Sequence, residues 1–179
     1  NDPGAGAWPT IYDSQAQTTS TAAVYPPGGV FIHRSGVGRA QWAVAKCVRL
    51  DNNGCSQGEA LVTDFGTTVE YGVKKAATTD DGCPFRGLAA ATIASNSYGF
   101  MYVAGYCEKA DLSHTAASGE YLCLSGSTAG KLTPNLASVF NNGYTCVAGS
   151  AASVVQLVAV ARTAIATGIG SVQIMGHWG

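Results

Sequence analysis

The sequence has little charge and no long apolar run. Only 12 % of its 179 residues are charged, about half of the roughly 25 % usual for a soluble domain. The net charge of −1 provides no basic surface for nucleic acid. The longest apolar stretch, residues 154–161, is broken by Gln156 and falls short of the roughly 18 residues of a membrane helix. We therefore expect no direct nucleic-acid or membrane partner, and the low charge favours a surface buried in an assembly.

Catalytic motifs are also missing. No G-x-S-x-G nucleophile elbow occurs in the chain. His114 lies among polar residues between two expected strands, which favours a solvated loop side chain, and it is the centre of the one enzyme alternative we keep. His33 stands at the end of an expected strand and His177 lies near the C-terminus. We expect no catalytic residue and no cofactor.

Acidic residues offer two pairs that glycoside hydrolysis could use. The adjacent Asp80 and Asp81 precede Gly82 and are more simply a turn, because Asp hydrogen-bonds its own backbone there. Glu108 and Asp111 are more simply a solvated face. Neither pair predicts a hydrolase.

The six cysteines form no C-x-x-C pair, and with three histidines they give no zinc-finger spacing. We therefore expect no metal site. An even count permits up to three disulfides, and Cys47 and Cys55 flank a turn that they could bridge. Cys107 and Cys123 lie within apolar segments, where a cysteine is commonly a small buried hydrophobe. Both interpretations stay open for the candidate disulfide cysteines, which are Cys47, Cys55, Cys83, Cys107, Cys123 and Cys146.

From residue 24 onward the pattern is typical of short strands separated by glycine turns, which indicates an all-β barrel or sandwich. Helices are expected at most around residues 134–139 and within 154–166. Expected strands cover residues 30–32, 41–50, 59–65, 67–74, 100–106, 121–124, 145–148, 154–162 and 171–175. We predict one compact β-rich domain over residues 24–179, preceded by an extended N-terminal arm over residues 1–23.

An internal repeat is the most informative feature. Residues 88–94 and 99–105 are echoed by residues 160–166 and 170–176, each copy having an Ile-Ala step, a Gly turn and a strand closed by Gly. A second echo pairs Gly58-Glu59-Ala60-Leu61 with Gly119-Glu120-Tyr121-Leu122. Two copies are too few for a solenoid. They predict two related β lobes wrapped into one core.

Large side chains in two places suggest contacts with other molecules. The polar arm carries Trp8, Ile11 and Tyr12, and aromatic residues are effective anchors, so we expect the arm to dock on a neighbour. The strand that contains Phe100 and Tyr102 is apolar on both faces, with one face for the core and the other for a neighbour. The alternative is that this strand is simply central in a two-layer fold.

The chain resembles the small β-rich structural proteins of tailed-bacteriophage particles, in particular capsid decoration (cement) proteins. The resemblance covers most of residues 24–176. It rests on Tyr25-Pro26-Pro27-Gly28-Gly29-Val30, residues 44–50, Gly58-Glu59-Ala60-Leu61, Arg86-Gly87-Leu88-Ala89, Ile93-Ala94, residues 99–105, residues 114–122, residues 125–132 and Ile165-Ala166-Thr167-Gly168. The six cysteines depart from the pattern of these proteins.

This resemblance implies a compact β-barrel or β-tulip-like body that assembles as a homotrimer on the exterior of an icosahedral capsid. Such proteins clamp neighbouring copies of the major capsid protein, often through an extended N-terminal arm. The expected localisation is the virion, with the host cytoplasm during assembly. The alternative is a receptor- or carbohydrate-binding domain of a tail or head fibre, with Trp42, Tyr98 or Trp178 in a shallow groove. A cell-wall hydrolase centred on His114 is a distant third.

Overall fold

A computed structural model describes residues 9–34, 42–50, 53–66, 71–79, 84–134 and 157–175, with the backbone alone for residues 42–47. The described part is nearly all β, as the sequence predicts, and contains one short helix. Its elements are β1 (Thr10–Tyr12), α1 (Asp13–Ala16), β2 (Val30–Arg34), β3 (Trp42–Leu50), β4 (Ala60–Thr63), β5 (Gly72–Lys75), β6 (Phe85–Ala89), β7 (Tyr98–Leu112), β8 (Tyr121–Leu124), β9 (Leu132–Pro134), β10 (Ala159–Ala161) and β11 (Gly168–Ile174).

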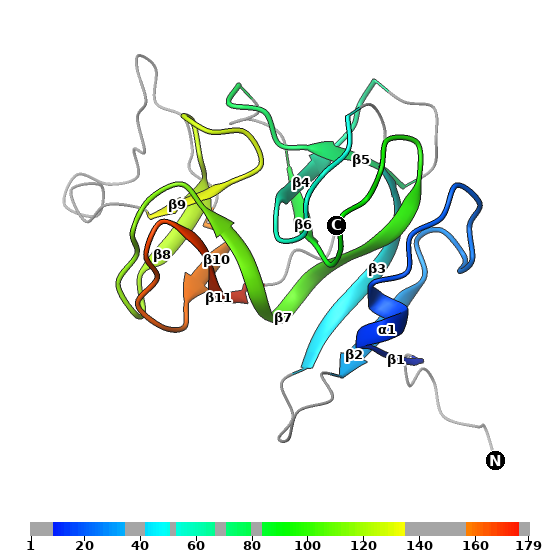
Figure 1. Cartoon of the computed structure of the whole chain (residues 1–179), viewed down its shortest axis with the longest axis horizontal. Coiled ribbons are helices and arrows are strands. Elements are labelled where there is room, and N and C mark those ends of the chain that lie inside the picture. Colours follow the sequence, from blue (N-terminus) through cyan, green and yellow to red (C-terminus); the bar gives the residue numbers. More distant parts are fainter. Residues whose placement is uncertain are drawn as a thin grey trace.

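Two closed rings of strands share the 15-residue strand β7. The first barrel runs β3-β5-β4-β6-β7 and closes where β7 pairs with β3. The second barrel runs β7-β11-β10-β8-β9 and closes where Leu112 of β7 pairs with Leu132 of β9. Figure 1 shows β7 passing from the group of β3 to β6 into the group of β8 to β11. The N-terminal half of β7 thus belongs to the first barrel and its C-terminal half to the second.

The two barrels have the same pairing order, which confirms the two related lobes. Each contains one parallel pair, β3 with β5 and β7 with β9, and its other four pairs are antiparallel. The register matches as well, because Leu50 opposite Val73 in the first barrel corresponds to Leu112 opposite Leu132 in the second.

The repeated sequence makes the same backbone hydrogen bonds in both barrels. Gly58 N–H donates to the Ala89 carbonyl at 2.8 Å, and Gly119 N–H donates to the Ala161 carbonyl at 2.8 Å. The repeated Ile of each copy lies against a glycine of the following strand. A Cβ at Gly99 would stand 2.7 Å from Ile93, and a Cβ at Gly170 would collide with Ile165. In both copies of the repeat, the isoleucine side chain therefore packs directly on the backbone of a glycine.

The core is continuous across both barrels. One cluster joins Phe85 and Leu88 of the first barrel to Leu122 and Val172 of the second. A second cluster fills the first barrel, and a third lies under the N-terminal segment. Burial of both faces of β7 follows, since each end of this strand lines a barrel and its middle crosses between them.

Residues 9–20 of the predicted arm pack on the first barrel. β1 pairs in parallel with β2, and the side chains of Ile11 and Ala16 are buried. Farther along, Ser20 pairs with Tyr98 at the start of β7. No periodic signal in the sequence predicts α1, because its four residues are too few to show one. Residues 1–8 lie outside the described part.

Several other expected elements are shorter than predicted or are not described. The strand expected over 67–74 corresponds to β5, of which residues 72–75 are described. Within 154–166, β10 is a strand of three residues. The strand expected over 145–148 and most of the helix candidate over 134–139 lie outside the described residues, although Pro134 ends β9. No helix of the described residues is long and apolar enough to cross a membrane.

Candidate functional site

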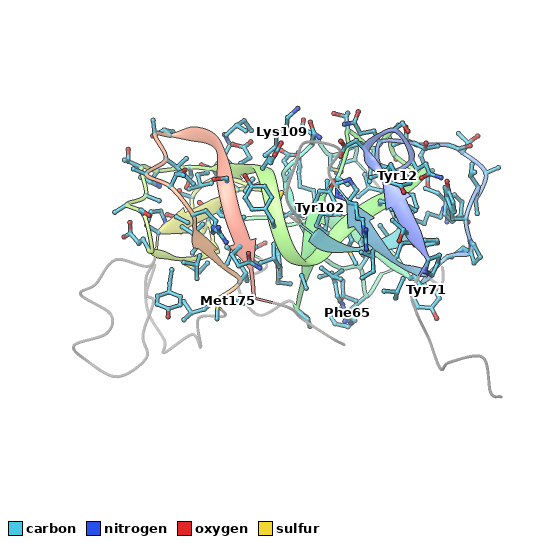
Figure 2. All side chains as sticks on the ribbon, turned by 90° about the horizontal axis from the view of Figure 1, so that it is seen from below. Tyr12, Phe65, Tyr71, Tyr102, Lys109 and Met175 are labelled. Carbon is cyan, nitrogen blue, oxygen red and sulfur yellow. The ribbon has the colours of Figure 1, made fainter. Side chains whose placement is uncertain are left out.

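One side of the molecule exposes three large apolar side chains. Phe65 is 73 % exposed, Met175 49 % and Tyr71 42 %. In Figure 2 these three lie along the lower side, whereas Tyr12 and Lys109 lie toward the upper side. We call Phe65, Tyr71 and Met175 the apolar face. The first two come from the first barrel, and Met175 follows the last strand of the second.

The backbone under each of these side chains is held in place. Phe65 stands at the tip of a turn in which Asp64 Oδ1 accepts a hydrogen bond from Gly66 N–H at 2.9 Å. This Asx-type turn directs the intervening side chain outward. Met175 N–H donates to the Val158 carbonyl at 3.1 Å, immediately after β11 ends. The apolar face is therefore built on fixed backbone.

Tyr71 has a strained backbone. Its φ of 58° lies in the left-handed region, which costs a non-glycine residue on the order of 1–3 kcal/mol. Its ring covers Gly28, where a Cβ would collide with the aromatic carbons. The glycine thus makes room for the ring, and the contact fixes an exposed aromatic side chain in one position. Strain of this kind persists only where surrounding structure imposes it.

The residues predicted to contact a neighbour divide between interior and surface. Ile11 and Phe100 are fully buried in this chain's own third cluster, so they are core residues rather than surface anchors. Phe100 packs edge-on against Tyr25 and Phe31, with ring centroids 5.1 and 5.4 Å away. The apolar second face of β7 is therefore covered within the chain, as in the alternative of a central strand.

Tyr12 is 58 % exposed, and Tyr102 is half-buried. The Tyr102 ring lies 5.2 Å from the His33 ring, and burial raises the pKa of its phenol well above its usual range. Trp8 lies outside the described residues. Of the five predicted contact residues, Tyr12 is thus the one that the structure places fully at the surface.

A contact between the buried His33 and the half-exposed Asp13 was not predicted. His33 Nε2 lies 2.8 Å from Asp13 Oδ1, which joins β2 to the N-terminus of α1. In the sequence His33 appears only as a strand-end residue, and its separation of 20 positions from Asp13 gives no spacing signal. Alternation along Val30–Arg34 does place His33 on the same face as Phe31, which could have indicated burial.

His114, the centre of the enzyme alternative, lies in a cluster of hydroxyl groups. Its Nδ1 is 2.9 Å from Ser113 Oγ and 3.3 Å from Thr133 Oγ1. Ser113 Oγ also lies 3.3 Å from the Leu132 carbonyl. The nearby Asp111 carboxylate pairs instead with Lys131 Nζ at 3.0 Å. Among the described residues no carboxylate is hydrogen-bonded to His114, so the third group that orients the base in a catalytic triad is not assembled here.

The other candidate groups do not come together in the described part of the chain. Glu108 is exposed and Asp111 is taken up by its ion pair, while Asp80 and Asp81 lie outside the described residues. Among the described residues, no group of three or more His, Cys, Asp or Glu side chains could hold a metal ion.

The described cysteines are buried. Cys55 and Cys107 are free thiols, so the bridge considered between Cys47 and Cys55 is not formed. Burial raises the pKa of Cys55 to about 11 and that of Cys107 to about 12, which leaves little thiolate at neutral pH. Cys123 Sγ lies 3.7 Å from the Thr133 carbonyl. Cys83, Cys146 and the side chain of Cys47 lie outside the described residues.

Tyr98, one of the aromatic residues considered for a glycan groove, lies beside a small hollow. This residue is half-buried under the N-terminal segment, and the hollow beside it encloses ≈ 10 Å³. Such a volume holds about one water molecule and no sugar ring. The side chains of Trp42 and Trp178 lie outside the described residues. No protein-family model matches the chain, and no curated protein is significantly similar to it.

Proposed function

We propose that this chain is a non-enzymatic structural protein of a tailed-bacteriophage particle, a decoration protein that binds the outer capsid and stabilises it. The observation that carries the proposal is the apolar face of Phe65, Tyr71 and Met175 on one side of a rigid double barrel. The resemblance of residues 24–176 to cement proteins supplies the particle and the partner. The partners are then further copies of this chain, in a homotrimer, and the major capsid protein.

Burial of apolar area is the force by which such a protein would act. Each roughly 100 Å² of apolar surface removed from water contributes on the order of 2.5 kcal/mol before association costs. An exposed Phe65 supplies much of that area in one side chain. Several copies bound side by side convert weak contacts into strong overall binding. A few apolar side chains per copy are therefore sufficient.

The fixed ring of Tyr71 supports the same proposal. A side chain that is already held in place loses little conformational entropy when a partner covers it. The ring of Tyr71 packs over Gly28, and its backbone is held in the left-handed region. The conformational entropy of this side chain is therefore lost on folding rather than on binding. This arrangement suits a binding anchor.

Shell binding tests the proposal. Capsids assembled without this chain are mixed with the purified protein, and bound copies are counted after gradient sedimentation. We expect saturable binding, and Phe65→Ser should raise the half-saturation concentration by about tenfold, equivalent to about 1.4 kcal/mol. Tyr12→Ser is the comparison variant, because it removes another aromatic side chain, 58 % exposed against 73 % for Phe65, from the opposite side.

Failure of the wild-type chain to bind these capsids would contradict the proposal. Equal effects of Phe65→Ser and Tyr12→Ser would show that the apolar face is not the contact.

A further inference from the structure

At Tyr98, the first residue of β7, the N-terminal segment covers the edge of the first barrel. Tyr98 N–H donates to the Ser20 carbonyl at 2.7 Å, and Ser20 N–H donates back to the Tyr98 carbonyl at 3.1 Å. Tyr98 also stands opposite Arg49 of β3. Both outward backbone groups of Tyr98 are therefore satisfied by a segment that precedes the barrel in the sequence.

The equivalent residue of the second barrel is Ile169. The repeat aligns Gly99 with Gly170, and hence Tyr98 with Ile169, which stands opposite Asp111 as Tyr98 stands opposite Arg49. Asp111 N–H donates to the Gly58 carbonyl at 3.1 Å, away from β11. In an antiparallel ladder, residues opposite each other point their backbone groups either both inward or both outward. The N–H and carbonyl of Ile169 therefore point away from β7.

This edge is open in the described part of the chain. β10 pairs with residues 172–174 of β11 and does not reach Ile169. No segment of the described residues takes the place that Ser20 has on the first barrel, and the Ile169 side chain is 57 % exposed. An exposed apolar residue with outward N–H and carbonyl groups is a template for pairing with another strand.

We propose that residues 1–8 of a second copy of this chain pair with the second barrel at Ile169. The first barrel supports this occupant, because there the equivalent edge is covered by this chain's own N-terminal segment. Residues 1–8 precede β1, and eight extended residues span up to about 28 Å. Figure 1 shows β1 and β11 on opposite sides of β7, and we assign the segment that pairs at Ile169 to another copy.

The sequence of this segment fits an edge contact. Gly4-Ala5-Gly6-Ala7-Trp8 has an N–H at every position, and its small side chains permit close approach of two backbones. Trp8 provides a large apolar surface to cover the Ile169 side chain. The inference rests on the proposed function in one respect, namely that copies of this chain lie side by side on a particle.

Sedimentation velocity of the full chain over a range of concentrations tests the inference. We expect concentration-dependent assembly. Ile169→Lys places a charge on the edge, which natural edge strands use to prevent pairing. It should raise the midpoint concentration by about tenfold or more, the loss expected for two backbone hydrogen bonds and an apolar contact. Ala94→Lys, which adds the same charge at an exposed turn of the first barrel, should assemble like the wild type.

Removal of residues 1–8 should have the same effect as Ile169→Lys, and combining the two changes should add nothing. A full chain that stays monomeric, an Ile169→Lys variant that assembles normally, or additive effects of the two changes would each overturn the inference. Circular dichroism of each variant checks that the barrels stay folded.

The two proposals fail separately. Assembly that depends on Ile169 in a protein that does not bind capsids would contradict the capsid role alone. If the chain binds capsids but Ile169→Lys assembles like the wild type, the edge contact alone would be contradicted.

Discussion

The two barrels differ at a glycine that their shared sequence motif repeats. Gly58 and Gly119 have nearly the same backbone, with φ of 84° and 82°, and donate to equivalent carbonyls. A Cβ on Gly58 would collide with the Lys109 carbonyl, whereas a Cβ on Gly119 would meet nothing within 4 Å. Glycine thus forms the turn in both barrels, but only in the first barrel does its missing side chain also allow the close approach of β7.

The repeated glutamates show the same contrast. Glu59 Oε2 accepts from Ser56 N–H and Glu120 Oε2 accepts from Ala117 N–H, both at 2.7 Å. Glu59 is buried and its Oε1 lies 3.7 Å from Lys75 Nζ, whereas Glu120 is partly exposed. A local motif is therefore conserved in geometry between the barrels while its surroundings change. At this glycine and glutamate the second barrel covers the first, whereas a Cβ at the equivalent Gly119 of the second would meet nothing within 4 Å.

The largest expected effect separates the two glycines. Gly58→Ala adds backbone strain of about 1–2 kcal/mol and a collision with the Lys109 carbonyl, so it should lower the free energy of unfolding by about 3 kcal/mol or more. Gly119→Ala adds the strain alone and should cost about 1–2 kcal/mol. Urea unfolding measures both. Equal losses would show that the barrels do not meet at Gly58.

Alkaline pH tests the buried thiols, one in each barrel. The pKa of Cys55 is about 11 and that of Cys107 about 12 in the folded chain, against 9.0 for an ordinary thiol. Above pH 9 the unfolded chain loses these protons first, so it binds fewer protons than the folded chain. Stability should therefore be unaffected by these thiols below pH 9 and fall above it, by about 1.4 kcal/mol per pH unit for each thiol.

Cys55→Ala and Cys107→Ala isolate this contribution, measured as the slope of the unfolding free energy against pH. Each variant should flatten the slope between pH 9 and the pKa of the thiol that it removes. A double variant with the wild-type slope would contradict the burial of both thiols.

The smallest expected effect concerns the glutamates. Glu59→Gln keeps an acceptor for Ser56 N–H but removes the charge, and it should cost about 1–2 kcal/mol because the carboxylate is buried beside Lys75. Glu120→Gln should cost about 0.5 kcal/mol, because water screens the partly exposed group. Thermal unfolding of the two variants shows which one loses more stability. A greater loss of stability for Glu120→Gln than for Glu59→Gln would contradict the contrast between the two barrels.

The sequence predicts the repeated parts of this fold well and the shared part poorly. The Ile-Ala steps and the Gly-Glu turns are local features, so their recurrence indicated two lobes before any pairing was known. The strand expected over 100–106 is in fact β7, which continues to Leu112. Glu108 and Lys109 interrupt its apolar pattern because they are exposed where β7 has left the first barrel. Only the tertiary arrangement explains why the strand continues there.

The candidate site was predicted less well for a similar reason. Ile11 and Phe100 are large apolar side chains, which made them candidate contacts, but side-chain type does not show whether a residue faces the core or the surface. The apolar face depends on Tyr71 and Gly28, which are brought together by a contact between distant segments. Ile169 becomes informative only through the register of the two barrels.

We propose that this chain is a structural component of the capsid exterior. The most direct test is its copy number in purified, gradient-banded virus particles, relative to the major capsid protein. We expect a number comparable with that of the capsid protein. A handful of copies per particle would place the chain in a tail or connector, and complete absence from the particles would contradict the structural role.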